Sequence, residues 1–471
     1  MSDVTVEARP GEPSMKTRVD AGQRSRYGAA LAVIALLAAY FYGTKLDQAP
    51  PFLHHDEIFV GLLGHSIAES GRDLSGRFIP VYFQIPSTVN WYPPIVVYAT
   101  AAWLSVLPLS DFAVRLPNVC VGVLSVVLMY FVARRVSHND RLGLLAAALL
   151  AVTPAHFIQS RISTDSLYPV VFILLWLLSL FRFLDRPSSW RIFLATGVLG
   201  IGVFSYIASV VMMPLYLAMT LALLLWDRRP MRHVVFAAAG FAWPMLLAAA
   251  FLAQHPEILG DFSTKYSLSG GQADLNPLQR LREAFTSWNI SDRLNLFHSF
   301  FDPGYLFVTG GTNIAHSTRQ VGVFLAPLAA FIAVGAYEAI TRPNRAALLA
   351  LAGFVTAPTA AVIVSESYAI PRELPVLPFG VLLATMGVAV MWRAPLSRSP
   401  KPIAVTLAVV LLILGSGYAA RMLIGQGRFS GSAVVLIVIG AALWVVGREC
   451  ERRRSWRPVA AGLLLLIPVQ F

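Results

Sequence analysis

Two imidazoles and two carboxylates stand side by side near the start of the chain, where residues 54–57 read His-His-Asp-Glu. A carboxylate beside an imidazole can act as a general base that takes a proton from a hydroxyl group, and the same side chains are ligands for divalent metals. We therefore take Asp56 and Glu57 as candidate catalytic residues. The alternative is a solvated cluster of surface side chains without a chemical role.

A third carboxylate, Asp165, closes the sequence SRISTD at 160–165, a short segment between two apolar runs. A carboxylate confined between two helix ends at a membrane surface needs solvent, a partner or a role in the chemistry. Arg161 in the same segment can form a structural ion pair with Asp165, or it can bind a phosphate through two parallel hydrogen bonds. Asp165 is accordingly the third catalytic candidate.

Late in the chain, residues 365–375 read SESYAIPRELP and place a cation between two carboxylates. Arg372 can neutralise a lipid phosphate at headgroup depth, and Glu366 and Glu373 can contact that ligand or its reaction partner. The alternative is that Arg372 only anchors a helix end by extending its charge to the membrane interface.

The composition predicts that a membrane surrounds these residues. Of the 471 residues, 56% are hydrophobic and only 13% are charged, and the mean hydropathy is +0.65. These values are too apolar for a soluble domain of this size. The net charge of +12 comes from short clusters between apolar runs, not from one basic and aromatic face. It therefore indicates membrane topology and argues against nucleic acid as a partner.

The apolar runs predict an all-α polytopic membrane protein with about thirteen transmembrane helices and juxtamembrane helices on its outer face. The positive-inside rule places the arginine clusters, and a disordered tail at 1–26, in the cytoplasm. A catalytic module over 27–393 with outer loops at 45–112 and 254–319 follows, and then C-terminal helices over 394–471. The expected spans lie near 27–44, 113–133, 141–157, 167–184, 191–207, 209–226, 233–253, 320–340, 346–365, 374–392, 402–420, 432–447 and 459–471.

One apolar run, at 93–107, is excluded from the spans. It is short and bounded by prolines, and a crossing there would invert every later loop relative to the charge clusters. We expect it to lie at the outer surface as a juxtamembrane or re-entrant element. With this assignment, Asp56, Asp165 and Arg372 all face the outside of the plasma (inner) membrane.

The expected spans carry almost no charge away from their ends. A lipid-linked sugar flippase or exporter needs polar groups along a path across the bilayer, so this scarcity counts against transport. An inactive relative that serves as a scaffold is the other alternative. Replacing Asp56 by Asn separates the hypotheses, because only an enzyme should lose a reaction.

The ordered set of short motifs resembles the C-type superfamily of membrane glycosyltransferases, above all the lipid A aminoarabinose transferases and the protein O-mannosyltransferases. The motifs are the Asp-Glu pair, NWYPPIVVY at 90–98, FAVRLPNV at 112–119, ARRV at 133–136 and SRISTD. The resemblance implies a polyprenyl-phosphate-linked sugar donor, an inverting transfer, and a lipid, glycan or protein acceptor. Asp56 matches the family's catalytic carboxylate, Asp165 its second acidic position, and 93–107 its juxtamembrane helix.

The chain also departs from that pattern. Many aminoarabinose transferases carry a lysine before the Pro-Pro pair, where it meets the donor phosphate, and here Tyr92 holds that phosphate-binding position. We therefore expect Arg372, and Arg161 second, to bind the phosphate. Contacts to donor or acceptor are assigned to His55 and to the two late glutamates. No metal is required for a monophosphate-linked donor. A divalent ion at Asp56 and Asp165 stays open, as in relatives that use pyrophosphate carriers.

Overall fold

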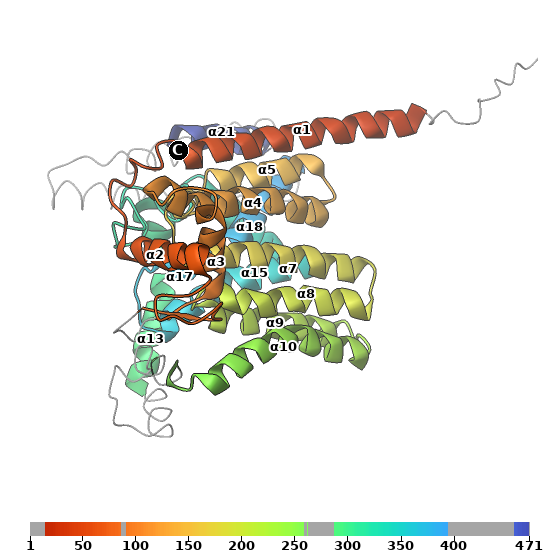
Figure 1. Cartoon of the computed structure of the whole chain (residues 1–471). Coiled ribbons are helices and arrows are strands. Elements are labelled where there is room, and N and C mark those ends of the chain that lie inside the picture. The colour runs from red at the N-terminus through yellow and green to blue at the C-terminus, as the bar shows by residue number, and fades with distance from the viewer. Residues whose placement is uncertain (1–14, 86–90, 259–260, 262–286, 394–455, 471) are drawn as a thin grey trace, which may run out of the picture.

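Long helices that run side by side make up most of the molecule, as Figure 1 shows. The computed structural model describes residues 15–85, 91–258, 261, 287–393 and 456–470. Within this part of the chain, six helical segments are long and apolar enough to cross a membrane: Ser25–Gly43, Asp111–Ser137, Asp165–Asp185, Ser209–Trp226, Met231–Gln254 and Arg345–Ile363. The expected all-α, polytopic class is therefore confirmed. The expected spans at 402–420 and 432–447 lie outside the described residues, so the count of thirteen stays a prediction.

Among the described residues, the bundle is built mainly from eleven helices, most of which match an expected span. They are α1 (Met15–Gly43), α4 (Asp111–Ser137), α5 (Asp140–Ala151), α7 (Tyr168–Asp185), α8 (Ser189–Gly202), α9 (Ser209–Trp226), α10 (Met231–Gln254), α14 (Leu328–Thr341), α15 (Arg345–Thr356), α18 (Val376–Arg393) and α21 (Arg457–Gln470). Helix α1 begins at Met15, before the expected span starts.

The helix α7 lies at the centre of the bundle. Trp176 on α7 is fully buried, stacks on Tyr216 of α9 with ring centroids 5.2 Å apart, and donates through Nε1 to Thr220 Oγ1 at 3.0 Å. By contrast, only 17% of the apolar window of α1 and of α10 is buried against protein. Within the part of the chain that the structure describes, these two helices therefore have the least buried apolar surface.

Two expected spans are broken by proline. The run at 141–157 divides into α5 and the short α6 (Pro154–Gln159), and the run at 346–365 divides into α15 and α16 (Thr359–Ile363) after Pro358. Proline lacks the N–H that a continuing helix needs. Thr153 before Pro154 is extended, as proline favours in the residue before it, whereas Ala357 before Pro358 keeps helical geometry, so the second interruption is slight. The first break brings residues 159–165 to the end of the bundle where α2 lies.

Short elements cover that end. Helix α2 (His55–Ser70) packs on α3 (Pro94–Leu104), which packs on α4, and a two-stranded hairpin pairs β1 (Phe83–Gln84) with β2 (Trp91–Tyr92). With 11 residues, α3 is about 16 Å long, roughly half of what a crossing needs. Helix α13 (Ser287–Ser299), the 3-10 turns η1 (Asp165–Leu167) and η2 (Val203–Ser205), the single π-helical turn η3 (Tyr305–Thr309) and α17 (Ile370–Glu373) complete the described elements.

Candidate functional site

The His-His-Asp-Glu sequence opens a helix instead of lying in a loop. His54 is the N-cap of α2: its ring nitrogen accepts from the backbone N–H of Asp56, and the carboxylate of Glu57 accepts from the backbone N–H of His54 at 2.9 Å. This reciprocal capping box fixes the first turn of α2. Asp56 and Glu57 are consecutive, so their side chains leave this turn in different directions.

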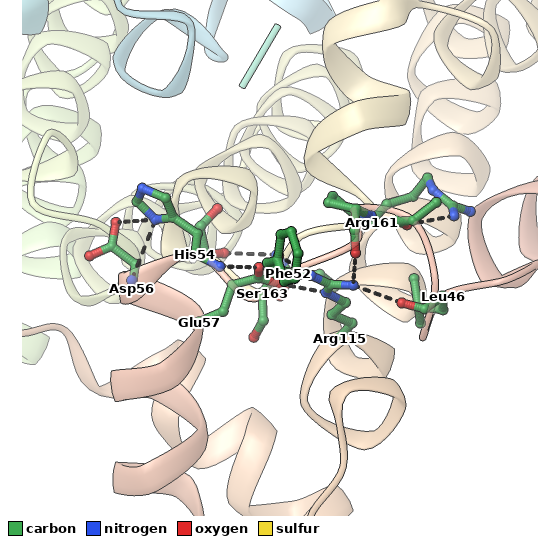
Figure 2. A network of polar contacts seen from close by, with 12 residues as sticks. Leu46, Phe52, His54, Asp56, Glu57, Arg115, Arg161 and Ser163 are labelled. Carbon is green, nitrogen blue, oxygen red and sulfur yellow. Dashed lines mark hydrogen bonds and ion pairs between the residues drawn. The ribbon is translucent and has the colours of Figure 1, made fainter. Parts of the chain in front are cut away.

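Glu57 points inward and is fully buried against Arg115 of α4, as Figure 2 shows. The guanidinium of Arg115 grips both carboxylate oxygens, with Nε 2.8 Å from Oε1 and Nη2 3.1 Å from Oε2. The backbone N–H of Ser163 adds a third donor, 2.9 Å from Oε1. The charge of Glu57 is thus paired and hydrogen-bonded on every side, which is what burial of an ion requires.

Two arginines tie the loop after α1 to this centre. Arg115 donates from its two terminal nitrogens to the carbonyls of Leu46, Pro50 and Phe52 at 2.8, 2.9 and 3.0 Å. Arg161 donates to the carbonyls of Phe41, Tyr42 and Ala49, each at 2.8 Å. Helix ends leave carbonyl groups without partners, and the two guanidinium groups supply those partners. Arg161 therefore braces the end of α1, and its charge is directed away from the carboxylate of Asp56 (Figure 2).

Asp56 lies on the accessible side of α2, with 35% of its side chain exposed. The hydroxyl of Tyr92 donates to its Oδ1. His54 Nδ1 lies 3.4 Å from Oδ2, and His55 Nε2 lies 3.3 Å from Oδ1. The Tyr92 hydroxyl therefore orients the carboxylate of Asp56, two imidazole nitrogens lie close to it, and part of its side chain stays exposed. Tyr92, which occupies the expected phosphate-binding position, thus contacts the carboxylate of Asp56.

The donor atoms of His54, His55 and Asp56 fit a divalent cation. One ligand atom from each of the three residues lies within 4.8 Å of the others, a spacing that a small ion can bridge. Two imidazoles and one carboxylate are the ligand types of zinc and related metals.

His316 closes the site from the opposite side. It is buried, its ring centroid lies 5.7 Å from that of His54, and its Nδ1 lies 3.1 Å from Gln159 Nε2. Burial, followed by the charge on His54, lowers the pKa of His316 to about 4, and the negative charges of Asp56 and Glu366 oppose that shift. His316 is therefore neutral at physiological pH.

The remaining predicted residues approach from two short elements. Asp165 begins the 3-10 turn η1, two residues after the Ser163 that donates to Glu57, and α17 packs against this turn. Arg372 on α17 forms an ion pair with Glu366, whose side chain is 51% exposed. The structure thus brings the α2 terminus, the Asp165 turn and the Arg372 helix to one end of the bundle.

Glu373 is turned away from solvent and is almost completely buried. Tyr305 donates its hydroxyl to Oε2, and the buried Oε1 has no hydrogen-bond partner within the described residues. Burial raises the pKa of Glu373 to about 8, although the hydrogen bond from Tyr305 lowers it. Glu373 is therefore a packed, largely protonated acid at neutral pH.

Sequence reasoning missed two residues of this site, Arg115 and His316. Arg115 lies inside the quoted FAVRLPNV sequence, and an arginine within a predicted span is a signal that a buried carboxylate partner exists. His316 carries no such local signal, because its role depends on contacts with residues far away in the sequence.

The comparisons with known proteins point to one group. Residues 92–253 match the family model described as dolichyl-phosphate-mannose-protein mannosyltransferase. ArnT from Cupriavidus metallidurans bound to undecaprenyl phosphate has a similar fold, with a TM-score of 0.55 at 14% identity over 95% of this chain and 76% of that one. ArnT in the apo state gives 0.54 at 15% identity with the same coverage.

The archaeal oligosaccharyltransferase AglB from Archaeoglobus fulgidus, in complex with an inhibitory peptide and a dolichol-phosphate, gives a TM-score of 0.46 at 13% identity over 94% of this chain and 56% of that one. No curated protein sequence matches the chain. The family model covers the FAVRLPNV and SRISTD motifs and residues 92–98 of NWYPPIVVY, and the fold is similar to that of ArnT. The predicted resemblance to the C-type glycosyltransferases is therefore confirmed, and the chain is a multi-pass membrane protein.

Proposed function

We propose that this protein transfers a sugar from a polyprenyl-phosphate carrier to a hydroxyl or phosphate acceptor on the outer face of the plasma membrane, with inversion at the sugar's anomeric carbon. The observation that carries the proposal is the accessible carboxylate of Asp56, oriented by Tyr92 at the end of a membrane bundle with the fold of ArnT. The mannosyltransferase family model supports the same reaction class.

In this mechanism, Asp56 is the general base. It takes the proton of an acceptor hydroxyl while the hydroxyl oxygen forms a bond to the anomeric carbon. The bond between that carbon and the phosphate oxygen breaks, and the lipid phosphate leaves with the bonding electrons. A single displacement of this kind inverts the configuration. Tyr92 keeps the carboxylate aligned, which matters because proton transfer requires hydrogen-bond distance to the hydroxyl.

Glu57 acts on this reaction indirectly. Both of its oxygens are occupied by Arg115 and by the backbone donors of His54 and Ser163. No lone pair is left in a position to take a substrate proton without breaking the buried pair. Glu57 is therefore a positioning residue that fixes the α2 terminus, and Asp165, on the adjacent turn, holds the acceptor or the donor.

Arg372 is the residue we assign to the donor phosphate. Its present partner, Glu366, is half exposed and can be exchanged for a phosphate at small cost, because exposed ion pairs contribute little. Arg161, the second candidate for binding the phosphate, is less suited to that role than Arg372, since its donors hold the end of α1. His55 and Glu366 remain at the rim, where either sugar or acceptor can contact them.

A metal ion is not required for this reaction. A lipid monophosphate leaves with modest charge, which basic side chains can neutralise. If an ion is bound, His54, His55 and Asp56 hold it, and it would neutralise charge on a leaving pyrophosphate. Sensitivity to a chelator separates the two situations.

The test is transfer of radiolabelled sugar from a panel of polyprenyl-phosphate donors in membranes that contain the wild-type protein, Asp56→Asn or Asp47→Asn. Asp47 is an exposed carboxylate in the same loop and is the matched control. We expect Asp56→Asn to lower the transfer rate by roughly a hundredfold to ten-thousandfold, as loss of a general base does, and Asp47→Asn to retain the wild-type rate.

Each reaction is run with and without chelator. Transfer that survives the chelator supports the metal-free mechanism. Transfer by Asp56→Asn at the wild-type rate contradicts the assignment of the base. A wild-type protein that binds donor but forms no product from any of them contradicts the enzyme and favours a flippase or a scaffold.

A further inference from the structure

A cavity of about 410 Å³ lies at the end of the bundle opposite Asp56. It is bounded by the C-terminal ends of α4 and α7 and by the N-terminal end of α15, whose bounds place them together there. Helix α4 alone, with 27 residues, spans about 40 Å between its start near α3 and its end at this cavity. The cavity is therefore separate from the candidate transferase site.

The polar lining of the cavity consists of two arginines, Arg135 and Arg345, together with His138, Asp185 and Asn344. Arg135 forms an ion pair with Asp185 through Nη2, while its Nε is buried without a hydrogen-bond partner within the described residues. Arg345 pairs with Asp227 through Nε at 3.0 Å, and 54% of its side chain is exposed. An arginine carries five donors, so both guanidinium groups keep hydrogen-bonding capacity for an anion.

The rest of the cavity lining is apolar and consists of Val136, Phe181, Leu184 and Ala346. A small inorganic anion has no apolar surface to bury against these side chains, whereas the glycerol and first acyl carbons of a phospholipid pack well against them. The α15 terminus adds a partial positive charge beside the arginines, since its N-cap Asn344 also lines the cavity.

The surroundings of the cavity are strongly positive. Arginines outnumber carboxylates at this end among the described residues. The arginines that flank it are Arg134, Arg182, Arg186, Arg191, Arg228, Arg229, Arg232 and Arg342, and the carboxylates at this end are Asp140, Asp185, Asp227 and Glu338. The positive-inside rule assigns such an end to the cytoplasmic leaflet, where anionic lipids concentrate.

We infer that this cavity binds the phosphate group of an anionic phospholipid from the leaflet at that end of the bundle. The phosphate takes the free donors of Arg135 and Arg345, and the glycerol region lies against Phe181 and Leu184. The lipid then links α15, whose Arg345 pairs with Asp227 at the end of α9, to the ends of α4 and α7, which the Arg135–Asp185 pair joins.

The experiment titrates the purified, delipidated full-length chain in detergent with phosphatidylglycerol and measures bound lipid by native mass spectrometry. Phosphatidylcholine and inorganic phosphate are added in separate arms. The variants are Arg135→Gln, Arg345→Gln and Ala346→Phe, which fills the cavity without changing the charge. Arg186→Gln is the matched control, because it removes the same charge at the same end from an exposed residue that does not line the cavity.

We expect each of the three cavity variants to weaken phosphatidylglycerol binding about fivefold or more, since a basic side chain on an anionic lipid contributes about that much and a phenylalanine at position 346 fills the space of the glycerol region. The control should stay within about twofold, because Arg186 does not line the cavity. Equal losses in Arg186→Gln, or no loss in Ala346→Phe, would overturn a built site in favour of general surface charge. Equal binding of phosphatidylcholine would overturn the selectivity for anionic lipid. Displacement of phosphatidylglycerol by an equal concentration of inorganic phosphate would assign the site to a soluble phosphate compound instead.

Discussion

Arginine side chains at the end of the bundle that carries the candidate site serve mainly as internal braces. Arg115 and Arg161 donate to carbonyls of the loop after α1, and Arg293 on α13 donates to the carbonyls of Val362 and Ile363 at 2.6 and 2.7 Å. Chain that leaves a membrane helix carries carbonyl groups without helical partners, and a planar guanidinium can satisfy several of them at once. An arginine beside a predicted active site is therefore weak evidence for a phosphate ligand.

The first prediction concerns Arg115. Arg115→Lys keeps the charge but cannot supply the fork that grips Glu57 together with three carbonyls, so buried acceptors lose their donors. We expect a loss of about 2–4 kcal/mol in the free energy of unfolding and a matching loss of transfer activity. Thermal unfolding in detergent measures the first effect. Arg134→Lys is the control, because its pair with Asp140 is partly exposed whereas the pair of Arg115 with Glu57 is fully buried, and an equal effect of both variants would contradict the brace.

The second prediction uses the buried acid Glu373. Its folded pKa of about 8 lies above the ordinary value of 4.5, so the folded protein holds a proton that the unfolded chain releases. The stabilisation this proton provides is complete below pH 4.5 and is lost as the pH rises through about 8. Glu373→Gln cannot ionise and should therefore lose less stability than the wild type over this window.

Thermal unfolding midpoints at about pH 5 and about pH 9 test this expectation. The difference between wild type and Glu373→Gln should widen toward the alkaline end. Glu366→Gln, a half-exposed carboxylate in a surface pair, is the control and should follow the wild type. Parallel curves for Glu373→Gln and the wild type would contradict a protonated Glu373.

At the scale of the elements, apolar run length predicted the helices but not their breaks. The spans at 113–133, 209–226 and 233–253 correspond to α4, α9 and α10, because each apolar run is continuous. Each of these helices contains a proline, which a membrane helix tolerates where neighbouring groups satisfy the freed backbone carbonyl. The divisions at Pro154 and Pro358 needed tertiary context, since Pro117 and Pro214 lie inside unbroken helices. The hydropathy of the runs does not distinguish the prolines that interrupt a helix from those that lie inside one.

The site was predictable only in part, for a related reason. Asp56 and Asp165 stand out because carboxylates near membrane helix ends are rare and costly. The contact that orients Asp56 is made by Tyr92, 36 positions away in the sequence, and the contact that holds Glu57 in a buried ion pair is made by Arg115, 58 positions away. No local spacing encodes such pairings, so a single sequence suggests which residues matter but not which one reacts.

The third prediction concerns the packing of α4 against the site segment. A Cβ added at Gly122 would lie 2.2 Å from Ser160 Oγ and 2.8 Å from its Cβ, a distance that real atoms do not reach. Gly122→Ala must therefore push the segment that carries Arg161 and Ser163 away from α4. We expect a loss of about 1–3 kcal/mol in stability and a fall in the transfer rate.

Gly28→Ala is the control for this change, since nothing lies within 4 Å of the added atom. Unfolding midpoints and initial transfer rates of both variants are compared with the wild type. A Gly122→Ala protein with wild-type stability and rate would show that the segment can move without cost, contrary to the close packing.

At the scale of the whole molecule, the two ends of the bundle differ in chemistry. The helices α2 and α17 lie at one end of the bundle (Figure 1). That end gathers carboxylates, histidines and aromatic rings, and arginines surround the cavity between α4, α7 and α15 at the opposite end. This asymmetry is the physical basis for orientation, because basic loops are retained in the cytoplasm during insertion. The proposed donor, with its sugar on the outer face of the membrane, and the proposed anionic lipid, in the cytoplasmic leaflet, both fit this orientation of the chain.

The last prediction tests that orientation directly. In a variant without the native Cys120 and Cys450, a single cysteine is placed at Ser75, which is exposed near α2, or at Thr341, which is exposed at the arginine-rich end. We expect a membrane-impermeant thiol reagent to label Ser75→Cys in intact cells and to label Thr341→Cys only after the membrane is made permeable. Labelling of Thr341→Cys in intact cells would invert the topology. The carboxylate cluster would then face the cytoplasm, and a donor displayed on the outer leaflet could not reach Asp56.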